Sequence, residues 1–445
     1  MKKRLSAKEI LYISSMLFGM FFGAGNLIFP VHMGQQAGYN VWHALAGFLI
    51  TGVGLPLLGV AALGISKSDG ISELCNKVGK KYSLFFTCAL YLTIGPFFAI
   101  PRCSTVSFTV GIIPVINSSS ALPLLIFSFL FFAAVLFFSL KPSKIMTWIG
   151  KILNPIFLVC LGILVIAALV SPLGSIKDIA PDEAYSQGAF FMGFLEGYNT
   201  MDALAGLAFG IVVVNVIKGL GINEPDDIAG NTVIAGIFSC IIMAIIYILV
   251  TIAGVLSRGA YPIADNGGEA LNVIASHYFG KAGAIVLALT VTFACLKTAI
   301  GLITSCSEAF EAMFKKGPSY KAWAIIFCVV SFLIANLGLD LIIDFSLPVL
   351  MFLYPLAITI ILLALFGKFY NNSKSVYCFV TAFTLIASVF DLFKALPDAA
   401  KHLLHLNGAV ELAEKFLPMF NLGLGWICPA AVGLIIGLIF KKIKD

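Results

Sequence analysis

Long apolar stretches separated by short polar loops make up most of the chain. A helix needs about 20 apolar residues to cross the hydrocarbon core of a bilayer, and twelve stretches are close to that length or longer. They lie at about 9–36, 41–65, 82–111, 122–140, 150–171, 188–217, 229–257, 282–307, 320–337, 341–366, 375–393 and 421–440. The pattern predicts an all-α polytopic membrane protein with about 12 transmembrane helices. Because the loops are short, we expect 1–445 to form a single transmembrane domain.

Two segments need a separate interpretation. The first stretch is long and continues into Asn26, Pro30 and a Gly/Gln turn, without a small-residue cleavage site, so we do not expect a removable signal peptide. The longest connection, 394–420, is predicted to form an amphipathic helix on the membrane surface. Its apolar residues are Leu403, Leu404, Val410, Leu412 and Phe416.

Composition agrees with this class and excludes others. Hydrophobic residues make up 60% of the chain, charged residues 11%, and the mean hydropathy is +1.03. A soluble domain carries about 25% charged residues, so the chain is not expected to be soluble, disordered, coiled-coil or collagen-like, or to bind nucleic acid. The 10 cysteines show no paired spacing. We therefore expect free packed thiols, with neither disulfides nor a metal cluster.

Lysine and arginine are distributed unevenly between the two sets of loops that twelve spans would create. Of the 28 Lys and Arg residues, 20 fall in loops on the side of the N-terminus and six in the opposite loops. The other two, Arg102 and Lys297, lie inside spans. Loops rich in positive charge remain in the cytoplasm. We therefore expect both termini to be cytoplasmic and the 394–420 segment to lie outside.

Two spans contain residues that disfavour a continuous membrane helix. The first includes GMFFGAGNLIFP, with a glycine cluster and the polar Asn26. The sixth includes EGYNTMD, with the carboxylates Glu196 and Asp202. Glycine costs about 1 kcal/mol relative to alanine in a helix, and a carboxylate at the bilayer centre costs about 2.5 kcal/mol or more. Irregular backbone at this depth must be buried in protein or line a cavity, although glycines alone also serve close helix packing.

The two interruptions are about 175 residues apart, and each lies near the start of a block of five spans. Because five is odd, the blocks 8–171 and 188–366 would enter the membrane in opposite orientations. This arrangement predicts a 5+5 inverted repeat with broken helices one and six, as in many secondary transporters. Residues 367–445 would then add two further helices and the external amphipathic segment.

Three separated motifs carry a resemblance to a known family. GMFFGAGNLIFP, GPFFAIPR (95–102) and EGYNTMDALA (196–205) resemble the branched-chain amino acid:cation symporters, the BrnQ-type carriers of the LIVCS family. The resemblance covers essentially the whole chain. It implies uptake of L-leucine, L-isoleucine and L-valine with a cation, usually Na⁺, across the bacterial cytoplasmic membrane. GAGN followed by FP is distantly similar to LeuT-like transporters, but Ile28 lies where those carry a gating arginine.

Unwound backbone at the two breaks is suited to a zwitterionic substrate. N–H groups at the start of a half-helix bind a carboxylate, and freed carbonyls bind an ammonium or a cation. We expect the carboxylate at the break of helix one, the ammonium at the break of helix six, and an apolar wall for the side chain. The predicted substrate-binding residues are Ala24, Gly25, Asn26, Phe97, Glu196, Gly197, Tyr198 and Asn199.

Span eight contains a neighbouring hydroxyl pair, Thr304 and Ser305. The resemblance to LeuT-like carriers implies a sodium site in which these hydroxyls and the carbonyl of Gly301 join carbonyls near Gly19 and Phe22. Hard cations favour such oxygen ligands. The alternative is that the two hydroxyls only bond to the preceding helical turn, as is common in membrane helices.

Two charged residues inside spans are further candidates for coupling or gating. A buried lysine is stable only beside an opposite charge or without its proton. Lys297 is therefore expected either to pair with Glu196 or Asp202, or to serve as a proton or substitute-cation site. Arg102 could form an outer gate with Asp344 or its neighbour Asp340, or it could extend to the membrane surface. Proton-coupled uptake through Lys297 and Glu196 therefore remains an alternative to sodium coupling.

Other functional classes lack a signal in the sequence. There is no HExxH motif for a metalloenzyme and no Walker loop for ATP-driven pumping. No repeated filter loop of a channel is visible. We expect a secondary transporter that is not an enzyme, needs no cofactor other than Na⁺ as coupling ion, and works in the lipid bilayer without an obligatory protein partner.

Overall fold

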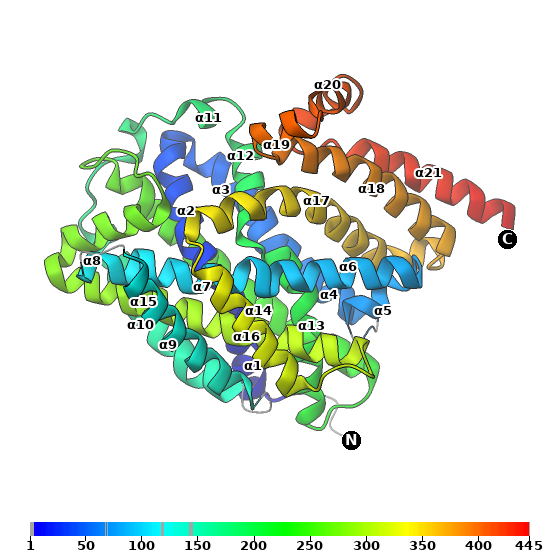
Figure 1. Ribbon diagram of the computed structural model, residues 1–445, viewed down its shortest axis with the longest axis horizontal. Helices are drawn as coiled ribbons and strands as arrows, with labels where there is room; N and C mark the ends of the chain where they lie inside the picture. The colour runs from blue at the N-terminus through cyan, green and yellow to red at the C-terminus, as the bar shows by residue number, and fades with distance from the viewer. Residues whose placement is uncertain (1–3, 67, 69, 117–119, 142–145, 445) are drawn as a thin grey trace.

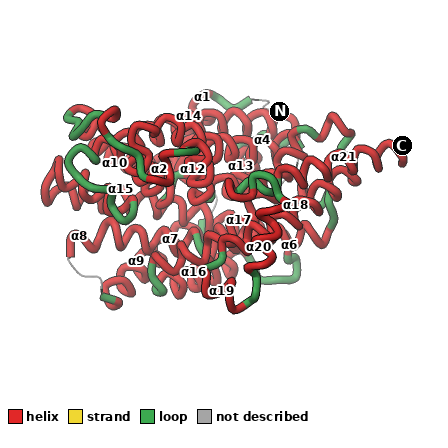
Figure 2. Tube along the Cα trace, turned by 90° about the horizontal axis from the view of Figure 1, so that it is seen from above, coloured by secondary structure: helices red, strands yellow, loops and turns green. Residues whose placement is uncertain are grey.

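The structure is a computed structural model that describes residues 4–66, 68, 70–116, 120–141 and 146–444. Within these residues the chain forms helices joined by short loops, and no strand is present (Figure 1, Figure 2). The predicted all-α class is confirmed.

The helices of the first predicted repeat include those of predicted spans one to five, together with short helices between them. They are α1 (Ala7–Phe21), α2 (Ala24–Ala37), η1 (Gly38–Asn40), α3 (Val41–Leu49), η2 (Ile50–Gly54), α4 (Leu55–Ile65), α5 (Ile71–Cys75), α6 (Lys80–Leu92), η3 (Thr93–Phe97), α7 (Ala99–Val106), η4 (Ser107–Ile112), α8 (Ile113–Ile116), α9 (Ala121–Ser139), η6 (Met146–Leu153) and α10 (Asn154–Val170). Helix one is α1 with α2, and helix three runs from α6 to α8.

The remaining helices include those of predicted spans six to twelve, together with short helices in the loops between them. They are η7 (Ile176–Asp178), α11 (Glu183–Ser186), α12 (Ala189–Glu196), η8 (Gly197–Thr200), α13 (Asp202–Gly219), α14 (Pro225–Ser257), α15 (Gly267–Met313), α16 (Tyr320–Ala335), α17 (Leu339–Leu365), η9 (Gly367–Tyr370), α18 (Lys374–Ala395), α19 (Asp398–Leu403), α20 (Asn407–Phe416), η10 (Phe420–Leu422) and α21 (Ile427–Lys444). Helix six is α12, η8 and α13.

By length and composition, nine helical runs among the described residues could cross a membrane on their own. The difference from 12 has identifiable causes. Helix one is divided by its break, and its second half runs on into the second predicted span as one segment, 24–65. The apolar helix α16 has only 16 residues, and α21 carries three lysines at its end.

Helices one and six are broken where the sequence indicates. In helix one, Phe22 (φ −75°, ψ 91°) and Gly23 (φ −115°, ψ −153°) are extended between α1 and α2. In helix six, a short 3₁₀ turn follows Glu196, and Met201 adopts a left-handed conformation (φ 63°) before α13 begins. Both breaks leave backbone groups without partners in their own helix.

Helix three contains a break that we did not predict. Gly95 has non-helical dihedrals (φ −91°, ψ −124°) inside the π-helical segment η3, directly before Pro96. Proline cannot donate an N–H to the helix and clashes with the preceding turn. The break therefore divides helix three into α6 and α7, and Arg102 lies in the first turn of α7 after the break.

The two broken helices pack closely on neighbours in the other half of the chain. Helix α2 contacts α14, and α12 contacts α3. Glycines at both crossings allow backbone to meet backbone: a Cβ there would lie 1.9–2.2 Å from a carbonyl oxygen of the facing helix. These residues are Gly34 and Gly254 at the α2–α14 crossing, and Gly47 and Gly193 at the α3–α12 crossing. Small residues at such crossings are typical of membrane helices.

The last two long helices lie outside this core. Figure 1 shows α18 and α21 side by side next to α17, which contacts α18. The 394–420 segment contains two short helices, α19 and α20, where we predicted one. His405 (φ 53°) is left-handed and interrupts them. Apolar side chains such as Leu403 and Phe416 are exposed, as an amphipathic surface segment requires.

Candidate substrate and ion site

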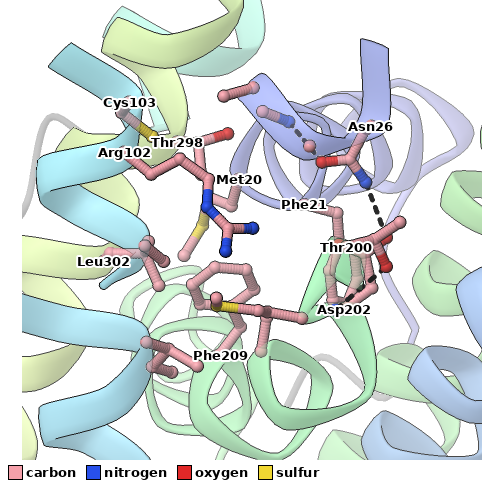
Figure 3. Close-up of a pocket in the computed structure, with 17 residues that line it drawn as sticks. Met20, Phe21, Asn26, Arg102, Cys103, Thr200, Asp202, Phe209, Thr298 and Leu302 are labelled. Atoms are coloured by element: carbon pink, nitrogen blue, oxygen red, sulfur yellow. Dashed lines mark hydrogen bonds between the residues drawn. The ribbon is translucent and has the colours of Figure 1, made fainter. Parts of the chain in front are cut away.

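A buried cavity lies where the breaks of helices one and six meet helices three and eight (Figure 3). Its volume is about 30 Å³, which would hold a water molecule or two but no amino acid side chain of leucine's size. Substrate binding must therefore widen it. The lining residues are Met20, Phe21, Gly23, Ala24, Gly25, Asn26, Ile94, Ala99, Arg102, Cys103, Thr200, Met201, Asp202, Ala205, Phe209, Thr298 and Leu302.

The start of α2 forms one wall of the cavity. The side-chain oxygen of Asn26 accepts a hydrogen bond from the N–H of Gly23 at 2.8 Å, which fixes the first turn after the break. The first N–H groups of a helix have no acceptor within the helix and carry a partial positive charge. The predicted carboxylate-binding residues Ala24, Gly25 and Asn26 thus all line the cavity.

Asp202 joins the broken helices through a buried hydrogen-bond network. Its Oδ2 accepts hydrogen bonds from Nδ2 of Asn26 at 2.6 Å and from the hydroxyl of Tyr247 at 2.7 Å. Asn26 Nδ2 also donates to the Tyr247 hydroxyl. All three side chains are at most 2% exposed. Because the three residues come from α2, α13 and α14, the network ties helices one, six and seven together at the cavity.

Arg102 of α7 extends its guanidinium into the cavity, facing Asn26 and Asp202 across it (Figure 3). The side chain donates to the carbonyl oxygen of Asn199 at 2.9 Å and to Oγ of Ser346 at 2.8 Å. It is 3% exposed, and its Nε is buried without a hydrogen-bond partner. Among the described residues no carboxylate lies within ion-pair distance of it.

The predicted outer gate between Arg102 and Asp344 is not formed. Asp344 and Asp340 are exposed, whereas Arg102 is buried. Arg102 instead bonds to Ser346, two residues after Asp344. Positions two apart on a helix point to nearly opposite sides, so the helix face that presents Ser346 to the cavity turns Asp344 away.

The remaining predicted substrate residues lie beside the cavity but do not line it. The Phe97 side chain is 42% exposed. Tyr198 stacks on Tyr354 with ring centroids 4.1 Å apart, and Gly197 packs against Thr51. For Gly197 and Tyr198 the 3₁₀ turn η8 is the physical reason, because it turns these two residues towards helices two and ten. Two further predicted residues, Glu196 and Asn199, are hydrogen-bonded to each other at 3.4 Å.

The predicted sodium ligands are not brought together. The Thr304 hydroxyl donates to the carbonyl of Ile300 in its own helix at 2.8 Å, and the Ser305 hydroxyl donates to the carbonyl of Ala208 at 2.8 Å. The Gly19 carbonyl accepts instead from the hydroxyl of Thr298 at 3.3 Å. Thr304 lies six positions after Thr298, which is about 9 Å along a helix. Of the other two predicted ligands, Gly301 faces Met20, and Phe22 lies in the extended break directly after α1.

Lys297 is fully buried beside the end of α1, without the predicted carboxylate partner. Its ammonium donates to Oδ1 of Asn154 at 3.3 Å and lies 3.8 Å from the ring centroid of Phe157 and 4.8 Å from that of Phe18. In the described part of the chain neither Glu196 nor Asp202 is within ion-pair distance. Asp202 is hydrogen-bonded to Asn26 and Tyr247, and Glu196 is hydrogen-bonded to Asn199. The neighbours of the Lys297 ammonium are therefore an amide and the faces of aromatic rings.

A family model described as "Branched-chain amino acid transport protein" matches residues 6–444, that is, all three motifs and both breaks. The chain belongs to this family. The branched-chain amino acid permease BrnQ of Lactobacillus delbrueckii subsp. lactis is 51% identical over 448 residues, which cover 99% of this chain and 100% of that protein. The BrnQ permease of Bacillus subtilis (strain 168) is 43% identical and covers 100% of this chain and 99% of its own.

A carrier protein of a branched-chain amino acid transport system in Pseudomonas aeruginosa is 38% identical, covering 99% of this chain and 97% of its own length. These members of the branched-chain amino acid transport family are permeases and carriers, so the chain is a transporter and not an enzyme.

Solved structures identify the fold. A nucleobase-cation-symport-1 family transporter in a closed conformation aligns with a TM-score of 0.61 at 12% identity, covering 96% of this chain and 91% of its own. MhsT in complex with L-phenylalanine aligns with a TM-score of 0.53 at 18% identity, covering 100% and 99%. The family member described here therefore has the LeuT-like fold with broken helices one and six, as the motifs indicated.

Several contributors to the site in this family member were not predicted. Tyr247 lies in a uniformly apolar run, IIYILV, which gives no signal. Thr298 and Asn154 were visible as polar residues in spans eight and five, but the sequence did not indicate which face of the helix they occupy. Ser346 likewise has no neighbouring motif. The break at Gly95 lies in the motif GPFFAIPR, which supported the family resemblance but from which we predicted no break.

Proposed function

We propose that this chain imports leucine, isoleucine and valine by symport with a cation, through alternating access. One observation supports this most directly: the ends of two broken helices meet at a buried cavity that has a guanidinium, a carboxylate, a helix N-terminus and an apolar remainder. Broken helices at the centre of an inverted repeat carry the binding site in many secondary transporters. The relatives' names supply the substrate class.

We further propose that it acts in the bacterial cytoplasmic membrane with both termini inside. The distribution of lysine and arginine supports this orientation. Reporter fusions at residue 445 and residue 407 should give opposite readouts, cytoplasmic for the first and external for the second. Equal readouts from the two fusions would contradict the twelve-span arrangement.

Two coupling ions are candidates, and different observations favour them. The family resemblance favours Na⁺, and Thr304 and Ser305 would ligate it only in a conformation in which their hydroxyls leave the carbonyls of Ile300 and Ala208. The surroundings of Lys297 favour a proton, because its ammonium already lies beside Phe18 and Phe22 at the end of α1, where a coupling cation was expected. A lysine that gains and loses its proton at this position would alternately supply and remove that positive charge.

Uptake of labelled leucine into membrane vesicles should test both the transport and the ion. We expect accumulation under an imposed gradient, and counterflow when vesicles are preloaded with unlabelled leucine. Under sodium coupling, an inward Na⁺ gradient at equal pH drives accumulation. Under proton coupling, an acidic exterior drives it without Na⁺. No counterflow under either condition would contradict a leucine carrier.

Matched variants then locate the coupling site. If Lys297 carries the coupling proton, Lys297→Met should lose pH-driven accumulation and keep leucine exchange. Lys394→Met is the control, because this lysine also lies over an aromatic ring, that of Phe420 at 4.8 Å, but belongs to α18 and does not line the cavity. If Thr304 ligates Na⁺, Thr304→Ala should raise the half-saturating Na⁺ concentration. We expect a change of about 5–150-fold, which corresponds to typical coupling free energies of about 1–3 kcal/mol.

A further inference from the structure

The cavity contains one cationic and one anionic side chain, supplied by different helices and not bonded to each other. Arg102 comes from α7 and Asp202 from the start of α13. Both line the cavity, and the described residues contain no ion pair between them. Two opposite charges buried in one cavity without direct contact are suited to a ligand that carries both a negative and a positive group.

The surroundings of Arg102 are suited to an anion. Its two hydrogen bonds go to neutral acceptors, the Asn199 carbonyl and the Ser346 hydroxyl. The nearby Phe29 ring, 5.6 Å from the guanidinium carbon, adds only an aromatic face. A buried charge without a counter-ion is costly. A carboxylate that accepts two parallel N–H bonds is the ligand that matches a guanidinium best.

The surroundings of Asp202 are suited to a cation. Its carboxylate receives hydrogen bonds from a neutral amide and a neutral hydroxyl, those of Asn26 and Tyr247, and both end on Oδ2. These two bonds fix the orientation of the carboxylate without neutralising its charge. An ammonium group can donate to the same carboxylate while the network stays in place.

We propose that Arg102 binds the α-carboxylate of the substrate and that Asp202 binds its α-ammonium group. The inference rests on the proposed function and deepens it, because it assigns the two charged groups of the amino acid to side chains, where our sequence analysis expected only backbone groups. The side chain of the substrate then faces Met20, Phe21, Ile94 and Leu302, which line the rest of the cavity. An apolar wall disfavours polar side chains.

This assignment predicts how the site treats analogues that lack one charge. A site built around polar groups rejects a ligand that leaves them unpaired by a large factor. We therefore expect 3-methylbutylamine, which lacks the carboxylate, and 4-methyl-2-oxopentanoate, which lacks the ammonium group, each to compete with labelled leucine at least 100-fold more weakly than leucine does.

Two substitutions should each remove one half of this discrimination. Arg102→Gln should weaken leucine binding about 100-fold and leave competition by the amine nearly unchanged, so the ratio of the two affinities falls. Asp202→Asn should do the same for leucine relative to the oxo acid. Arg102→Lys and Asp202→Glu keep the charges and should retain part of the discrimination, which separates loss of charge from loss of folding.

A second arginine provides the control. Arg258 donates to the Gln35 carbonyl and also has a buried Nε without a partner, but it does not line the cavity. Arg258→Gln should keep the wild-type ratio of leucine to amine binding. If the wild-type chain binds leucine and Arg102→Gln keeps the wild-type ratio, the assignment of Arg102 is wrong, and an unchanged leucine to oxo acid ratio in Asp202→Asn overturns that of Asp202. If the wild-type chain binds no leucine, the proposed function itself fails.

Discussion

Substitution of Gly25 by leucine is expected to reduce leucine binding at least 100-fold while the protein remains folded. Gly25 is the second residue of α2 and lines the cavity. A Cβ at this position would meet the ring of Phe29 at 3.1 Å and the carbonyl oxygen of Asn199 at 3.4 Å. The ring can turn aside, so the fold tolerates the change, but the remaining three side-chain carbons would occupy a cavity of only about 30 Å³. Binding of labelled leucine to purified protein measures the effect.

Gly230→Leu is the matched control for this substitution. Gly230 is an exposed residue of α14, and a Cβ there would meet no atom within 4 Å. This variant should bind leucine as the wild type does. Unfolding temperatures of both variants near that of the wild type would show that Gly25→Leu acts at the site. Normal leucine affinity in Gly25→Leu would contradict the placement of the substrate at the start of α2.

A large loss of stability is expected from Gly254→Ala. Gly254 lies where α14 crosses α2, and a Cβ there would lie 2.1 Å from the carbonyl oxygen of Val31. The obstacle is backbone, so no side chain can turn away, and the two helices must separate. Overpacking a well-packed interior typically costs about 1–3 kcal/mol, and we expect a decrease in the free energy of unfolding at the upper end of this range. Thermal unfolding in detergent measures it.

The same helix supplies the control. Gly230→Ala introduces the same methyl group where nothing is near, and alanine is favoured over glycine in a helix by about 1 kcal/mol. This variant should therefore be as stable as the wild type or slightly more stable. Equal stability of Gly254→Ala and Gly230→Ala would mean that α2 and α14 are not in backbone contact.

The sequence was most informative where a residue is expensive in a membrane helix. The glycines around Asn26 and the carboxylates of EGYNTMD disfavour a continuous helix in any surroundings, so both breaks could be predicted without knowing what packs against them. The apolar spans were predictable because their length and composition alone favour a membrane helix. The single amphipathic helix expected over 394–420 was less secure, because a left-handed residue such as His405 leaves no clear signal in a polar loop.

The partners of the charged residues could not be predicted in this way. For Lys297 we expected either a carboxylate partner or a proton or substitute-cation site, and its neighbours are Asn154 and aromatic rings. Which face of a span turns inward depends on the crossing of neighbouring helices, and a uniformly apolar span leaves this open. The resemblance to LeuT-like carriers placed Thr304 and Ser305 in a shared ion site, but it does not fix the register of span eight against helix one.

The position of Cys103 has a practical consequence for following the transport cycle. This free thiol is adjacent to Arg102, lines the cavity and is 2% exposed. A water-soluble alkylating reagent can therefore reach it only through a pathway that opens from one side of the membrane. The rate at which a reagent added on one side alkylates the Cys103 thiol therefore measures how often the cavity is open to that side.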